Sequence, residues 1–119
     1  MSLGGELQGV GRLLDVAGLR HRVIASNLAN ANTPNYLRRE VRFEEALVKA
    51  LEGGGDAEAV RPEVVVDADS PTRLDGNNVE SERELVDLSK NALMYQALSR
   101  AAASKAGMLR AAIMGRGGV

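Results

Sequence analysis

The chain has no cysteine and no tryptophan, and only one phenylalanine and two tyrosines among its 119 residues. Without cysteine it forms no disulfide, no thiolate metal site and no cysteine nucleophile. One histidine, His21, supplies too few donors for a zinc site. Because large aromatic side chains are scarce, any hydrophobic core consists mainly of leucine, valine and alanine.

Charge and hydropathy exclude further classes. Sixteen acidic residues nearly balance 15 basic ones, which argues against a nucleic-acid-binding surface. No apolar run approaches the roughly 20 residues that cross a bilayer. The first residues lack a basic segment followed by an uninterrupted apolar stretch, so we expect no cleaved signal peptide.

The short motifs of catalytic and phosphate-binding sites are also missing from the sequence. Two acidic groups, Glu44-Glu45 and Glu80, Glu82 and Glu84, stand at expected helix starts, where negative charge complements the helix dipole. We therefore interpret them as structural rather than as general acids or bases. We expect a protein that is not an enzyme, with no cofactor, no metal and no small-molecule substrate.

Two long segments carry an unbroken heptad pattern of apolar residues, which is typical of a coiled coil. The first pattern consists of Leu3, Leu7, Val10, Leu14, Ala17, His21, Ile24, Leu28 and Ala31. The second consists of Leu85, Leu88, Ala92, Tyr95, Ser99, Ala102, Ala106, Leu109 and Ile113. We predict a mainly α fold in which helices 1–33 and 78–115 pair as an antiparallel coiled coil and form an inner domain.

The second helix is apolar on several sides, so it needs more neighbours than one partner helix provides. We expect other chains to supply them. Five glycines weaken the first helix, each by roughly 1 kcal/mol relative to alanine, which suggests ends that become ordered on assembly. His21 is interpreted as a packing or interfacial residue.

The middle segment, 34–77, is expected to be irregular with small regular pieces. Residues 37–43 are predicted to be extended, 43–51 to form a short helix that ends at the glycines 53–55, and 64–66 to form a short strand. A turn at 75–78 precedes the last helix. Ser81 and Glu84 fit a capping box, although Asn78 could cap the helix one turn earlier.

The stretch NLANANTPNY, residues 27–36, ends the first helix with amides and a proline. Pro34 disfavours helical geometry at the residue before it. Amide side chains can hydrogen-bond the last helix carbonyls and the backbone of a turn. We predict a structural corner whose motif residues are Asn27, Asn30, Asn32, Pro34 and Tyr36.

Three segments, 20–47, 74–91 and 91–98, together resemble the flagellar basal-body rod proteins, and among these the subunits of the proximal rod. The asparagine-rich stretch resembles a motif shared by rod and hook axial proteins. The DGNNV turn is more specific to the subunits of the proximal rod. The chain departs from the family pattern at Asn35, where glycine is usual, and its middle is shorter. Asparagine tolerates a left-handed backbone, so we expect the corner to survive.

The resemblance implies a structural subunit of the rod that transmits torque. It implies export by the flagellar type III apparatus without a cleaved signal peptide, and a place in the periplasmic rod of the basal body. The implied partners are copies of the chain, other rod proteins, the MS-ring junction protein and the export gate. Phe43 and Leu47 have the form of the family's export-gate recognition element, although a packed phenylalanine is the simpler interpretation.

Two alternatives stay open at this point. One is a paralogous subunit of the proximal rod. The other is a soluble coiled-coil adaptor or flagellar export chaperone that folds alone as a helical hairpin. A cooperative melt of the isolated chain would favour the adaptor.

Overall fold

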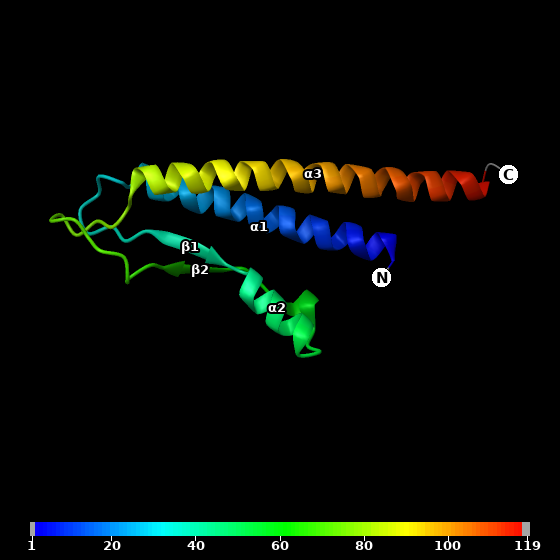
Figure 1. Ribbon diagram of the computed structural model, residues 1–119, viewed down its shortest axis with the longest axis horizontal. Coiled ribbons are helices and arrows are strands. Elements are labelled where there is room, and N and C mark those ends of the chain that lie inside the picture. The colour runs from blue at the N-terminus through cyan, green and yellow to red at the C-terminus, as the bar shows by residue number, and fades with distance from the viewer. Residues whose placement is uncertain (1, 118–119) are drawn as a thin grey trace.

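The computed structural model describes residues 2–117, and two long helices lie side by side along its length (Figure 1). They run antiparallel, and the smaller elements of the middle segment lie beside the first of them. The elements in chain order are α1 (Leu3–Ala29), β1 (Arg39–Arg42), α2 (Glu44–Glu52), the 3-10 helix η1 (Ala57–Ala59), β2 (Glu63–Val66) and α3 (Ser81–Gly117). The predicted fold class, long paired terminal helices with a small β-containing middle, is confirmed.

The molecule is elongated, with extents of 70 × 30 × 15 Å and a radius of gyration of 18.7 Å. A compact chain of this length has a radius of gyration of about 13 Å. α3 has 37 residues and α1 has 27, so α3 extends about 15 Å past the N-terminus of α1 at the usual helical rise (Figure 1). This end of α3 has no partner helix within the described residues.

α1 begins and ends on side-chain hydrogen bonds. Ser2 caps its start by accepting from the Gly5 N–H at 3.0 Å. The helix ends at Ala29, earlier than the expected limit at residue 33. Asn30 already leaves helical geometry, and its Nδ2 donates to the Ser26 carbonyl at 2.8 Å. Amide hydrogen bonding therefore ends the helix before Pro34 is reached.

α3 begins at Ser81, three residues later than expected. Asn78 does not cap it, because the Asn78 side chain bonds to the Arg38 N–H and the Asp67 carbonyl. The predicted capping box with Ser81 is also absent from the described contacts, since the Glu84 carboxylate accepts from Arg38 and Asn27 instead. The side chains of Asn78 and Glu84 thus form long-range hydrogen bonds instead of capping the start of α3.

The middle segment folds onto a second face of α1. β1 pairs antiparallel with β2, with Arg39 opposite Val66 and Arg42 opposite Glu63. The core cluster lies where this sheet and α2 meet α1, and it consists of buried Val16, Val41 and Phe43 with partly buried Leu13, Leu19, Val23, Leu47 and Val60 around it. α1 therefore contributes to two interfaces, one with α3 and one with the middle.

The predicted heptad positions are covered unevenly. In α1, Ala17 and Ile24 are buried, whereas Leu3, Leu7, Val10, Leu14 and Leu28 are half-buried. In α3, Leu88 and Leu109 are half-buried, but Leu85, Tyr95 and Ile113 are exposed. Asn91, which is not a predicted position, is buried and donates to the Ala17 carbonyl at 2.8 Å. One partner helix covers only part of the apolar surface of α3, so these expected seam positions are not all covered within one chain.

No helix of the described part combines the length and apolar character needed to span a bilayer.

Candidate assembly site at the asparagine corner

Buried polar side chains gather where α1 ends and α3 begins. Asn27, Arg38, Asn77, Asn78 and Glu84 are each at most 4% exposed, and we refer to this group as the asparagine corner. Within residues 2–115, every buried side-chain nitrogen and oxygen has a hydrogen-bond partner. A buried polar group without a partner costs about 1–3 kcal/mol, so full pairing makes the corner a specific junction rather than a loose loop.

Asn27 links three segments through one amide. Its Nδ2 donates to the Arg39 carbonyl at 2.8 Å and to Glu84 Oε2 at 3.1 Å. Its Oδ1 accepts from the Arg39 N–H at 2.9 Å and from the Tyr36 hydroxyl at 3.2 Å. Asn27 thereby pairs with the start of β1 as a neighbouring strand would, while it also holds α3.

Asn77 closes the end of α1 from the other side. Its Nδ2 donates to the carbonyls of Asn30 at 2.8 Å and Thr33 at 2.9 Å, and its Oδ1 accepts from the Val79 N–H at 2.7 Å. The last carbonyls of a helix and of the turn after it have no partner in the helix itself. One amide, 47 residues further along the chain than Asn30, supplies partners for two of them.

Arg38 is the charged centre of the corner. Its Nε donates to Glu84 Oε1 at 2.7 Å, and its Nη1 lies 3.0 Å from Asp67 and 3.4 Å from Glu40. Burial opposes the charge, but the hydrogen bonds to Glu84 and Asp67 hold the pKa of Arg38 above its ordinary value. Hydrogen bonds from the Ser70 hydroxyl and N–H and from Arg38 hold the pKa of Asp67 well below its usual range. Both groups are therefore charged in the folded chain at neutral pH.

The tip of the corner brings two left-handed residues together. Asn35 has φ 63° and Gly76 has φ 80°. The Asn35 N–H donates to the Asp75 carbonyl at 2.8 Å. A Cβ at Gly76 would overlap the Asn35 Oδ1. The close approach of the two turns requires glycine at position 76, whereas asparagine suffices at position 35.

The family model for "Flagella basal body rod protein" matches residues 20–36, which are the end of α1 and the turn that follows it. The FlgB rod protein of Borrelia hermsii is 35% identical over 104 residues, covering 71% of this chain and 77% of that protein. FlgB of Escherichia coli K12 is 31% identical over 103 residues, covering 70% and 74%. FlgB of Bacillus subtilis is 28% identical over 130 aligned positions, covering 97% and 98%.

The chain belongs to the FlgB family of flagellar basal body rod proteins. It is thus a structural subunit of the rod, located in the flagellar basal body, as the resemblance implied. Membership in the FlgB family favours this function over the alternative of a soluble adaptor or export chaperone. Of the residues that form the asparagine corner, Asn27 lies in the segment that the family model recognises.

The structure brings together some of the predicted motif residues of this FlgB-family chain. Asn27, Asn30 and Tyr36 take part in the hydrogen bonds of the corner. Asn32 and Pro34 are exposed, and the Asn32 side chain makes no hydrogen bond among the described residues. We expected Asn32 to bond the helix end, but Asn77 takes that role.

Sequence reasoning missed Arg38, Asn77, Asn78 and Glu84 as parts of the corner. Asn77 was expected only as a turn residue, Asn78 as a turn residue or a helix cap, and Glu84 as part of a capping box at a helix start. Their partners lie 40 to 57 positions away in the chain, and no local spacing reports such contacts. The one available signal was the presence of amide clusters at both ends of the middle segment.

The residues expected for export-gate recognition lie at the other end of the middle segment. Phe43 is 2% exposed in the core cluster, and Leu47 packs against that cluster. The Arg12 guanidinium lies 5.6 Å from the centre of the Phe43 ring, and Arg12 also donates to the carbonyls of Ala57 and Val60. A partner that binds the Phe43 side chain can therefore reach it only when the chain is unfolded.

His21, expected in a packing position, is exposed.

Proposed function

We propose that this FlgB-family subunit lies in the proximal rod, where α1 and α3 pack with neighbouring subunits into the inner tube and transmit torque. The observation that carries the proposal is the exposed apolar face of α3. This face is the helix side opposite α1, and the residues on it have no covering element within the described chain.

Helical geometry places the exposed residues on one stripe. At 100° per residue, Val86, Leu93, Ala97 and Met108 fall within about 60° of one another, opposite buried Glu84. Leu93 is 67% exposed, and Val86 and Met108 are more than half exposed. Burying a large apolar side chain stabilises a complex by about 1.5–3 kcal/mol. The stripe is thus suited to contact with further helices.

The surface of the monomer supports the same proposal. Its solvent-accessible area is 8134 Å², whereas a compact monomer of 12.6 kDa exposes about 6200 Å². The surplus of about 1900 Å² is comparable with the total area buried in a standard protein–protein interface. A subunit of this shape can lose much of its surplus surface to neighbours without changing its own fold.

The finer partners follow from the same position in the rod. We expect contacts with copies of the chain, other rod proteins, the MS-ring junction protein and the export gate. We also expect export by the flagellar type III apparatus in an unfolded form. The burial of Phe43 supports export in an unfolded form, because a recognition element that contains Phe43 and Leu47 is accessible to the gate only in the unfolded chain.

Replacement of Leu93 by aspartate tests the proposal in the bacterium that encodes the chain. The Leu93→Asp variant replaces the native copy, and the chain is measured in whole cells and in purified basal bodies by immunoblotting, together with swimming. We expect normal synthesis, loss of the chain from basal bodies and loss of swimming, because a charge in an apolar helix interface is expensive to bury.

Gln8→Asp is the matched control, because Gln8 is an exposed polar residue of α1 and receives the same new side chain. We expect this variant to enter basal bodies and to support swimming. Normal incorporation of the Leu93→Asp variant would contradict the proposed role of the α3 face.

A further inference from the structure

We infer that copies of this chain also contact each other head to tail, with the outer face of α2 in one copy docked into a groove between α1, β1 and α3 of the next. The inference rests on the proposed function in that it supplies a copy-to-copy contact within the rod. It involves surfaces separate from the apolar stripe of α3, and the groove shares only Arg38 with the asparagine corner.

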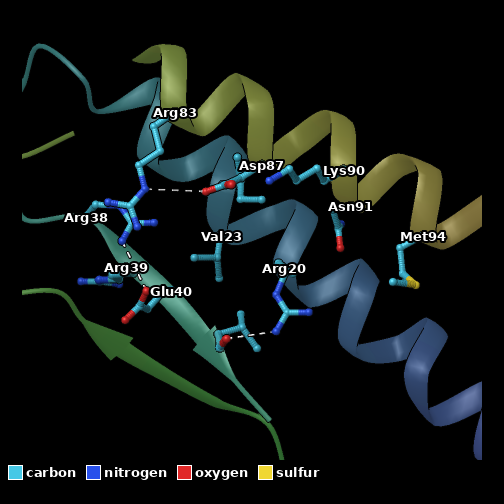
Figure 2. A pocket seen from close by; sticks show the side chains of 12 residues that line it. Arg20, Val23, Arg38, Arg39, Glu40, Arg83, Asp87, Lys90, Asn91 and Met94 are labelled. Carbon is cyan, nitrogen blue, oxygen red and sulfur yellow. Dashed lines mark hydrogen bonds and ion pairs between the residues drawn. The ribbon is translucent and has the colours of Figure 1, made fainter. Parts of the chain in front are cut away.

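The groove is basic at its rims and apolar at its floor. It has a volume of about 330 Å³ and is lined by all three elements, as Figure 2 shows. Val23, Ile24, Val41 and Met94 form its apolar part. The charged lining comprises five basic side chains, Arg20, Arg38, Arg39, Arg83 and Lys90, and only two acidic ones, Glu40 and Asp87.

The basic side chains differ in how far they are neutralised. Arg38 bonds to the buried Glu84 carboxylate, Arg20 bonds to Glu44 at 2.9 Å, and Arg83 lies 4.0 Å from Asp87. Arg39 and Lys90 are exposed and have no carboxylate within salt-bridge distance among the described residues. Arg39 and Lys90 approach the groove from β1 and α3 (Figure 2). The positive charge of the groove is thus carried mainly by these two residues.

The outer face of α2 has the opposite character. Glu45, Val48 and Glu52 follow one another at i, i+3 and i+7, so they form one stripe on the helix, with Leu51 beside it. All four are exposed, Val48 by 49% and Leu51 by 63%. Five acidic residues and one lysine lie between positions 44 and 58. α2 therefore presents an apolar ridge edged with carboxylates.

The ridge and the groove match in both charge and polarity. Val48 and Leu51 would cover the apolar floor, while Glu45 and Glu52 would meet Arg39 and Lys90 at the rims. Complementary charges of this kind set the register of a contact and disfavour wrong partners. α2 cannot fill the groove of its own chain, because Phe43 and Leu47 fix its inner face to the core cluster.

The symmetry of the contact favours assembly over dimerisation. Ridge and groove are different surfaces of the same chain, so one contact leaves a free ridge on one copy and a free groove on the other. Such a heterologous contact produces a ring or an open helix rather than a closed two-fold dimer. A second copy is therefore the occupant that suits a subunit of a cylindrical structure.

Site-directed cross-linking tests the contact. Because the native sequence has no cysteine, only the introduced thiols of this chain react. Full-length Val48→Cys and Met94→Cys chains are mixed and treated with a short bismaleimide, both in concentrated solution and in basal bodies from cells that express both variants. We expect a covalent dimer of one Val48→Cys and one Met94→Cys chain. Ser89→Cys is the matched control, because Ser89 is an exposed residue of α3 that lies outside both the groove and the apolar stripe.

Charge reversal then tests complementarity. We expect Arg39→Glu with Lys90→Glu in the Met94→Cys chain to lower the yield roughly fivefold, and Glu45→Lys with Glu52→Lys in the Val48→Cys chain to do the same. Combining the two sets should restore the yield, which also shows that the variants fold. Arg22→Glu with the Glu45→Lys and Glu52→Lys set should not restore it, since Arg22 lies outside the groove.

Two results would overturn the inference: no cross-link in either setting, or equal yields from Met94→Cys and Ser89→Cys. The chain is measured in the same basal bodies by immunoblotting. If it is present there without the cross-link, the groove contact fails while the proposed rod function stands. If the cross-link forms in solution but the chain is absent from basal bodies, the proposed function fails while the contact stands.

Discussion

Replacing Glu84 by glutamine removes the charge that faces Arg38 while it keeps the size and shape of the side chain. Glu84 is fully buried, and Arg38 is 4% exposed. The glutamine keeps one oxygen as an acceptor, but its NH₂ group must then face either the Arg38 Nε or the Asn27 Nδ2, both of which are donors. The variant therefore loses a charge-assisted hydrogen bond and gains a clash between donors.

The cost follows from the remaining partners of Arg38. Removing one member of a buried ion pair typically costs 3–5 kcal/mol. Arg38 keeps Asp67 at 3.0 Å and Glu40 at 3.4 Å, so the lower end applies. We expect Glu84→Gln to lower the free energy of unfolding by about 3 kcal/mol, a large part of the stability of a small domain.

Urea unfolding of the full chain, followed by circular dichroism, measures this change. Hydrogen exchange of the Arg38 and Arg39 amides reports the corner directly, because they donate to Asn78 and Asn27. Glu82→Gln is the matched control at an exposed position two residues away and should change stability by less than about 0.5 kcal/mol. A loss below about 1 kcal/mol for Glu84→Gln, with unchanged amide exchange, would show that the Glu84–Arg38 pair does not stabilise the corner.

Three further changes test the geometry of the corner by the same urea assay. Gly76→Ala should destabilise the chain by about 2 kcal/mol, because φ is 80° and the new Cβ meets Asn35. Gly55→Ala is the control and should not destabilise the chain, because a Cβ at this position makes only ordinary contacts. Equal effects of the two changes would contradict the prediction. Asn35→Gly should stabilise the chain by up to about 1 kcal/mol, since φ at this position is 63°; a clear loss would contradict it. The pKa of Asp67 is lower in the folded chain than in the unfolded one, so its contribution to stability is present at neutral pH, begins to decline as pH falls below about 5 and is fully lost only below the depressed folded-state pKa. Asp67→Asn should therefore show a shallower pH dependence between about pH 5 and pH 3, and an unchanged slope would count against the contribution of Asp67.

The fold was predictable where the determinants are local. Heptad spacing indicated both long helices, and glycines at 53–55 indicated the end of α2, which stops at Glu52. Helix limits were less accurate because side chains far along the chain decide them. Asn77, not Asn32, makes the hydrogen bonds to the end of α1, and Asn78 bonds to Arg38 instead of capping α3.

The candidate site was predictable only in part for the same reason. A stretch with amides at 27, 30 and 32 indicated a corner, but the sequence does not say which amide is buried. Asn27 faces β1, Asn30 bonds within its own helix, and Asn32 points to solvent. The role of Glu84 depends on Arg38, which is 46 positions away, and only the folded chain places the two side chains together.

We propose above that neighbouring subunits bury the apolar stripe of α3 in the rod. Thiol labelling of a Leu93→Cys chain measures this directly, because the native sequence has no cysteine. We expect a maleimide to label the thiol readily in the free chain, where Leu93 is 67% exposed. In purified basal bodies we expect labelling to be at least tenfold slower, which corresponds to about 1.4 kcal/mol of protection. Equal labelling rates in the two states would contradict it.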